Sequence, residues 1–334
     1  MSGERDRREW IVMVAVAALI LTLPLFHLTD YMMRVATMTG VYVIASVGWT
    51  LLGGYANQIS IGQSIMFGIG AYTSTLLFSD FRLSPWIGIW AGAALAVLVA
   101  AGIGAIVFRL GGHYFALATL ALAEIVRIVA IYVQPLTGGA GGVSLPFVRS
   151  SLWLLQFPLA RNYYEVVAVA VLLTLALARG VLRSKLGYRL RAIRDDEVAA
   201  RLAGIDVFWT KMQAFALGAV LSAIGGTFYA QVTGFVDPDS VLSITVSVQL
   251  ALYAIVGGAQ VWWGPLLGAA LLVPLGEAMT GSGSGAAAGI AKVVYGLILI
   301  AVVVLQPEGI AGFFGRLGAR SRRRAPAPEG SMTC

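Results

Sequence analysis

Apolar runs of bilayer-spanning length recur along the sequence, and they constrain the fold more than any other feature. A membrane-spanning helix needs about 20 predominantly apolar residues. Only 12% of the residues are charged, whereas soluble domains carry about 25%. The sequence therefore predicts an all-α integral membrane protein, a polytopic helical bundle with about 10 (8–10) spans, some of them glycine-broken or half-helices. We expect spans at residues 10–27, 33–52, 60–78, 86–108, 115–133, 163–178, 212–232, 242–256, 261–279 and 290–305.

The two ends of the chain differ from this apolar middle. Residues 1–9 predict a short cytoplasmic N-terminus, residues 10–315 a transmembrane domain, and residues 316–334 a basic tail rich in Arg and Pro. A tail of that composition cannot bury enough apolar surface to fold, so we expect it to be disordered. The first span leads directly into the next apolar run without a small-residue cleavage site, which favours a retained span over a signal peptide.

Basic residues between the spans account for the net charge of +7. With both termini inside, most of the 23 lysines and arginines face the cytoplasm, as the positive-inside rule requires. Clusters of basic residues also occur in nucleic-acid-binding proteins, but here anchoring of the spans beside anionic lipid is the simpler interpretation. We therefore expect the lipid bilayer, and no nucleic acid, as the partner of these clusters.

Sequence signatures of enzymes are absent. The chain has no HExxH, GxSxG, CxxC or GxxxxGK[ST] pattern. Its two histidines, His27 and His113, are far apart at predicted span ends, and its single cysteine, Cys334, cannot build a disulfide framework or a thiolate metal site. The sequence thus predicts no catalytic residues, no metal and no cofactor.

Glycine pairs interrupt two apolar segments about 200 residues apart, at residues 51–74 and 255–269. Interrupted segments in corresponding positions of two halves point to a translocation site, because non-helical backbone at membrane depth must line protein or a watery cavity. Close helix packing through small residues is the alternative, and both can hold. The residues that we expect to line a pathway for a small zwitterionic or uncharged solute are Asn57, Gln58, Ser60, Gln63, Ser64, Tyr72, Gly257, Gly258, Gln260 and Gly264.

Four charged residues fall in or near the predicted spans. Glu124 and Arg127 stand three apart on one expected helix, so they face the same side and can pair. Glu277 and Lys292 lie near the ends of the last two spans. Charges within spans are often functional, but the sequence assigns no role to these four.

One inner connection, residues 179–211, is long enough to hold structure of its own. Its middle lacks Gly and Pro until Gly204, where a helix C-cap is expected. We expect one short surface helix at about residues 191–204, which either docks on a partner or is simply a solvated amphipathic loop. The candidate contact residues are Arg191, Arg194, Asp195, Asp196, Glu197, Ala199, Ala200, Arg201 and Gly204.

Six segments, in this order and spacing, resemble the inner-membrane permease subunits of the high-affinity branched-chain amino acid ABC importers (the LivM type). The resemblance covers about residues 38–306. The segments are GGYANQISIGQSIMFGIGAYTS, HYFALATLALAEIVR, LTGGAGGVSLP, SKLGYRLRAIRDDEVAARLAGIDV, GGTFYAQVTGFVDPDS and IVGGAQVWWGPLLGA.

The resemblance implies a non-enzymatic transport subunit in a bacterial inner membrane that carries leucine, isoleucine or valine. Its implied partners are a homologous permease subunit, two ABC ATPase subunits and a periplasmic substrate-binding protein. In related importers a loop with an Ala-Ala-xxx-Gly pattern docks on the ATPase; Ala199, Ala200 and Gly204 match it, while Glu197 is displaced by one position. Two alternatives stay open. The substrate of such an importer could instead be another amino acid or a urea- or amide-type solute, and the chain could instead be a stand-alone secondary transporter or channel.

Overall fold

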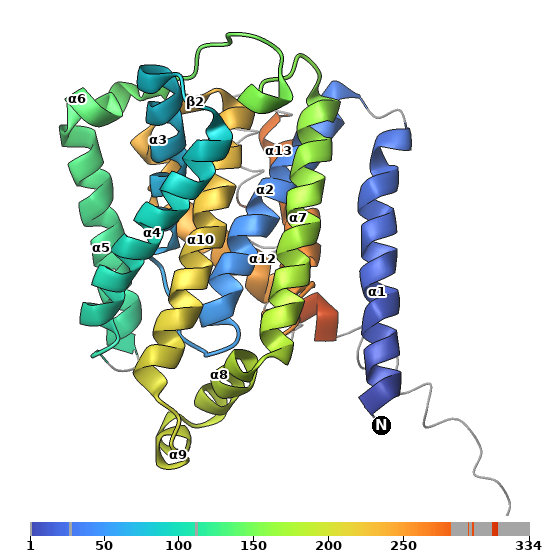
Figure 1. Ribbon diagram of the computed structural model, residues 1–334, viewed down its shortest axis with the longest axis vertical. Helices are drawn as coiled ribbons and strands as arrows, with labels where there is room; N and C mark the ends of the chain where they lie inside the picture. The colour runs from blue at the N-terminus through green and yellow to red at the C-terminus, as the bar shows by residue number, and fades with distance from the viewer. Residues whose placement is uncertain are drawn as a thin grey trace, which may run out of the picture.

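The computed structural model is a bundle of long helices over the residues that it describes, which are 2–26, 29–110, 113–281, 293, 296 and 309–312. These helices run roughly along one common direction (Figure 1). They are α1 (Ser2–Thr22), α2 (Asp30–Gly53), α3 (Gln63–Phe81), α4 (Pro85–Val107), α5 (His113–Tyr132), α7 (Ala160–Arg183), α10 (Val207–Thr233), α12 (Ile244–Gly257) and α13 (Gly264–Gly281).

Short elements mark the two ends of the bundle (Figure 1). At one end, α8 (Lys185–Asp195) and α9 (Glu197–Leu202) connect α7 to α10, and we call this the linker end. At the other end, which we call the strand end, β1 (Val143–Ser144) pairs antiparallel with β2 (Phe235–Val236). The remaining short elements are η1 (Leu23–Phe26), α6 (Gln134–Thr137), η2 (Gly139–Gly141), η3 (Leu152–Leu154) and α11 (Pro238–Val241).

Six stretches of the described chain are long and apolar enough to cross a membrane, which confirms the prediction of an all-α polytopic membrane protein. They are Asp30–Gly53, Pro85–Val107, Tyr114–Tyr132, Ala160–Arg183, Val207–Thr233 and Pro238–Gly257. The apolar parts of α1 and α13 are shorter. The expected count of about ten spans is not confirmed. Apart from Val293 and Gly296, which are helical, the predicted span at 290–305 lies outside the described residues, as does the tail.

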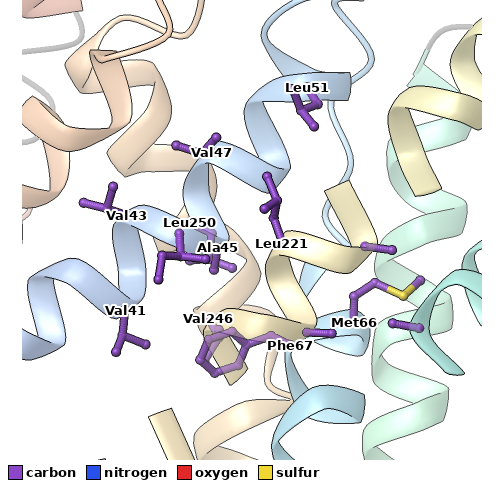
Figure 2. Close-up of a cluster of buried hydrophobic side chains, with 14 of the residues drawn as sticks. Val41, Val43, Ala45, Val47, Leu51, Met66, Phe67, Leu221, Val246 and Leu250 are labelled. Atoms are coloured by element: carbon purple, nitrogen blue, oxygen red, sulfur yellow. The ribbon is translucent and has the colours of Figure 1, made fainter. Parts of the chain in front are cut away.

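Helix α2 lies in the core of the bundle. Every residue from Val43 to Gly53 is buried, so protein surrounds this half of the helix on all sides. Figure 2 shows its apolar side chains projecting in several directions, toward Phe67 of α3, Leu221 of α10 and Leu250 of α12. Helices α7, α10, α12 and α13 pack directly against α2.

Helices α3 and α10 approach each other more closely than side chains would allow. A Cβ atom at Gly226 of α10 would overlap the carbonyl oxygen of Phe67, and one at Gly70 of α3 would overlap that of Ala223. In addition, the Thr227 hydroxyl donates to the Gly70 carbonyl at 3.0 Å. Small residues permit such backbone contact between helices in lipid, where the hydrophobic effect does not drive helices together.

A second glycine contact joins α10 to the core helix. A Cβ atom at Gly218 of α10 would lie 2.5 Å from the carbonyl oxygen of Gly48 on α2, and the reverse distance is 2.6 Å. Helix α10 is thus in direct backbone contact with α3 on one side and with α2 on another. The three helices α2, α3 and α10 therefore form one closely packed unit.

We expect Gly226→Ala to lower the melting temperature of the purified chain in detergent, because its methyl group must push α3 away from α10. Overpacking of this kind costs about 1–3 kcal/mol. The matched control is Gly102→Ala in α4, where an added Cβ meets no atom within 4 Å. Equal melting temperatures for the two variants would show that the contact between α3 and α10 is not rigid.

Candidate functional site

The two glycine-broken segments lie next to each other. Residues 54–62 separate α2 from α3, and residues 258–263 separate α12 from α13, so each pair forms a helical hairpin. A Cβ atom at Gly54 would overlap the carbonyl oxygen of Ala259, which places the two breaks in direct contact. The hydroxyl of Ser46 also donates to the Leu250 carbonyl at 2.7 Å and ties α2 to α12. The structure thus brings the two interrupted segments together at one place.

Two polar residues of the first segment, Gln63 and Ser64, bond to other helices. The Gln63 amide donates to the Gly218 carbonyl at 3.2 Å and to the Ser222 hydroxyl at 2.6 Å, both on α10. The Ser64 N–H donates to the Ser247 hydroxyl of α12 at 2.8 Å. Both side chains are buried. Their geometry therefore gives them a packing role at the junction of three helices.

Ser60 secures the break itself. Its carbonyl accepts a hydrogen bond from the Trp49 indole at 2.7 Å, and its hydroxyl accepts one from the Gly62 N–H at 3.3 Å. The N–H of Ile61 donates to the Thr119 hydroxyl of α5 at 3.1 Å. Side chains of α2 and α5 therefore satisfy part of the backbone that leaves the helix here.

The other predicted pathway residues divide into two groups. Gly257, Gly258 and Gly264 are buried, and a Cβ at Gly257 would overlap the Gly264 carbonyl, so they serve close packing of α12 and α13. Tyr72 is also buried in α3, and its hydroxyl has no hydrogen-bond partner among the described residues. Of the predicted pathway residues, Asn57, Gln58 and Gln260 have side chains that remain accessible. A pathway along these segments stays a prediction.

An ion cluster links α5 to α11 at the strand end. The Arg127 guanidinium bonds both carboxylate oxygens of Glu124 at 3.1 Å through Nε, as their spacing predicts. It also contacts the Asp239 carboxylate of α11, which sequence spacing did not indicate. The cluster is partly exposed and holds α5 to the segment after β2. Lys292 lies outside the described residues.

The inner connection contains two helices, where the sequence predicts one helix over about residues 191–204. Asp196 has an extended backbone with φ −158°, which ends α8. Its carboxylate accepts hydrogen bonds from the N–H groups of Val198 and Ala199 at 2.8 and 2.9 Å, which starts α9. Aspartate is a strongly preferred N-cap residue, and this preference explains the break.

Helix α9 ends at the glycine that the sequence indicates. Gly204 has φ +81°, and its N–H bonds the Arg201 carbonyl at 3.0 Å. The N–H of Ile205 bonds the Ala200 carbonyl, also at 3.0 Å. Together these bonds form a Schellman motif, which terminates a helix sharply. With Asp196 at its start, α9 is therefore capped at both ends.

Glu197 fastens α9 to the first turns of α10. One carboxylate oxygen lies 2.7 Å from the ammonium group of Lys211, whose side chain is only 6% exposed. The other lies 2.8 Å from Arg201. Sequence reasoning placed Glu197 on the partner surface and did not single out Lys211. The one available signal was the lysine at the start of a predicted span.

One exposed face of α9 is apolar. Val198 is 68% and Leu202 85% exposed, and their spacing of four residues places them on one helix face. Ala200, on the inner face, packs with Ile193 and Val207. Val198 and Leu202 therefore form a small apolar face that the rest of the described chain does not cover. Of the predicted contact residues, Arg191 instead bonds the carbonyl oxygens of nearby helix turns.

Comparison with known proteins decides the family. The model of the family described as "Branched-chain amino acid transport system / permease component" matches residues 31–303. The chain belongs to this family. The resemblance found in the sequence motifs is thereby confirmed, and the chain is a multi-pass membrane permease.

Permeases of two named types are similar to the chain. The high-affinity branched-chain amino acid transport system permease protein LivM of Salmonella typhimurium is 29% identical, covering 83% of this chain and 69% of the relative. LivM of Escherichia coli is 28% identical over 91% of this chain and 75% of the relative. LivH of Salmonella typhimurium is 24% identical over 86% of this chain and 96% of the relative. No solved structure matches the chain.

We expect Glu197→Ala to destabilise the chain by about 1–3 kcal/mol, because it leaves the buried Lys211 ammonium without its carboxylate. Lys211→Met, which removes the buried charge itself, should cost less. Thermal unfolding in detergent measures both. The matched control is Arg161→Ala, which breaks an exposed pair with Glu165 on α7 and should cost at most about 0.5 kcal/mol. An equal loss for Glu197→Ala and Arg161→Ala would contradict the buried-pair assignment.

Proposed function

We propose that the chain is the translocation subunit of a bacterial ABC importer for leucine, isoleucine and valine. It would work in the inner membrane beside a homologous permease, above two ABC ATPase subunits, and receive substrate from a periplasmic binding protein. The observation that carries this proposal is the doubly capped helix α9 with its exposed apolar face, on a chain of this permease family.

The source of energy follows from what the chain contains. Its sequence has no phosphate-binding loop, so ATP must be hydrolysed by a separate subunit. Helix α9 offers that subunit Val198 and Leu202 as apolar anchors, with Asp195 and Arg201 exposed around them. Because both ends of α9 are capped and Glu197 binds Lys211, α9 holds these two side chains in fixed positions on the surface. We therefore propose that the linker end faces the cytoplasm, and that both termini are cytoplasmic as well.

The pairing with a second permease is supported by the two relative types. LivM and LivH are both named as permease proteins of branched-chain amino acid transport systems. A single chain in which α2 is surrounded by protein leaves little room for a pathway through its own centre. We therefore place the pathway between two such chains, with the contacting glycine-broken segments beside it.

Uptake of radiolabelled leucine tests the substrate. Cells that lack their own branched-chain uptake, and that express this chain with its neighbouring permease, ATPase and binding-protein genes, should import leucine, isoleucine and valine. Omission of either the ATPases or the chain should abolish uptake. Import of urea or short amides in place of these amino acids would overturn the assigned substrate, and uptake without the ATPases would favour a stand-alone transporter.

Leu202→Asp tests the docking of the ATPase. We expect the variant chain to fold and insert normally, because Leu202 contacts little of its own chain, but to lose about tenfold or more of ATPase co-purification as an apolar anchor is replaced by a charge. The matched control is Leu152→Asp, an exposed leucine at the strand end. Full co-purification of the ATPase with Leu202→Asp would show that α9 is not the contact.

A further inference from the structure

A cavity of about 390 Å³ is lined by residues of α2, α10 and α13. These residues lie at the start of α2 and near the end of α10, which is the strand end of the bundle. One face of α2 lines it with residues 31, 34, 35, 38 and 42, which recur at the spacing of a single helical stripe. Tyr229 and Thr233 of α10 and Glu277 of α13 complete the lining. Pockets that hold small molecules have volumes of about 300–1,000 Å³, so the cavity is large enough for one small solute.

The inner part of the cavity is aromatic. Tyr42 lies at the centre of a ring cluster, 6.3 Å from Tyr229, 5.7 Å from Tyr253 and 6.5 Å from Phe67. Phe67 and Tyr229 also meet edge to face at 5.5 Å. These rings come from α2, α3, α10 and α12, so the cavity ends on the closely packed unit of the fold. Its inner part is therefore firmly held and consists of aromatic rings.

The mouth of the cavity carries opposite charges on two different helices. Arg34 of α2 supplies a guanidinium group, and Glu277 of α13 supplies a carboxylate. Both side chains are exposed at the cavity and accessible from the strand end. Between these charges and the rings, the side chains of Val35 and Met38 provide an apolar wall. The sequence had assigned no role to Glu277 or to Arg34.

We propose that this cavity is a binding site for a zwitterionic α-amino acid on the outer side of the permease. The Arg34 guanidinium would bind the carboxylate in the bidentate geometry that arginine favours, and Glu277 would accept hydrogen bonds from the ammonium group. Val35, Met38 and the tyrosine rings would receive a branched aliphatic side chain. This inference rests on the proposed function and names the residues that would receive the solute.

Protection of an engineered thiol tests the site in the assembled complex. Cys334 is the single cysteine, so Met38→Cys in a Cys334→Ser background places one thiol in the cavity. The complex is reconstituted in liposomes without binding protein, and a membrane-impermeant maleimide is added in the resting and in the vanadate-trapped state. Leucine should slow the labelling, whereas leucinamide, which lacks the carboxylate, and 4-methylpentanoate, which lacks the ammonium group, should need about tenfold higher concentrations or more.

Charge-neutralised variants identify the groups that bind. In the same single-cysteine background, Arg34→Gln and Glu277→Gln should each raise the leucine concentration for half-protection by about tenfold or more, because a charged hydrogen-bond partner is lost. The matched controls are Arg161→Gln and Glu165→Gln, an exposed pair at the start of α7, which should leave protection unchanged. Protection that is equal for leucine and its two analogues, or the absence of labelling in both states, would overturn the site.

The outcomes also separate this site from the function on which it rests. Import of leucine by the wild-type complex together with unchanged protection in Arg34→Gln and Glu277→Gln refutes the site and leaves the importer intact. Failure of both import and protection refutes both. A phosphatidylethanolamine headgroup is also zwitterionic, so the assay is repeated in liposomes of phosphatidylglycerol alone. Protection that requires phosphatidylethanolamine and not leucine would assign the cavity to lipid and overturn the proposal.

Discussion

Direct backbone contact between helices is the constraint on which the rest of this structure depends. In lipid, apolar side chains gain nothing from turning inward, so helices associate through close approach and hydrogen bonds. At Gly70 and Gly226, carbonyl groups of α3 and α10 contact the backbone of the other helix. Gly48 and Gly218 allow the same contact between α2 and α10. These three helices position the first glycine-broken segment, most of the aromatic floor of the cavity and the end of the inner connection.

The polar residues of the first interrupted segment follow from the same constraint. After α2 ends at Gly53, the backbone of the break is no longer paired within a helix and needs other hydrogen-bond partners. Trp49 and Thr119 provide two of them, and Gln63 reaches the Gly218 carbonyl exposed by the glycine contact. The amide and hydroxyl side chains in this apolar segment thus serve first to connect helices, even in a permease.

The sequence predicted which segments are helical but not which helices are central. Helices α5 and α10 both come from apolar runs long enough to cross a membrane, yet 22% of the spanning window is buried in Tyr114–Tyr132 and 67% in Val207–Thr233. Helix faces that contact lipid and helix faces that contact protein both carry apolar side chains. Apolar periodicity therefore cannot tell a peripheral helix from a central one. Gly204 was predictable because a helix-ending glycine acts locally. The break at Asp196 was missed because its capping preference competes with good helix formers on both sides, and the Glu197–Lys211 pair was missed because it depends on where α10 begins.

The length of α10 connects the two ends of the molecule mechanically. Its 27 residues extend about 40 Å without interruption. The buried ammonium of Lys211 fixes its first turns to α9, and Tyr229 and Thr233 near its last turn form a wall of the cavity. Along the way it packs on α2, α3 and α4. One continuous helix therefore connects the exposed face of α9 at the linker end to the wall of the cavity at the strand end.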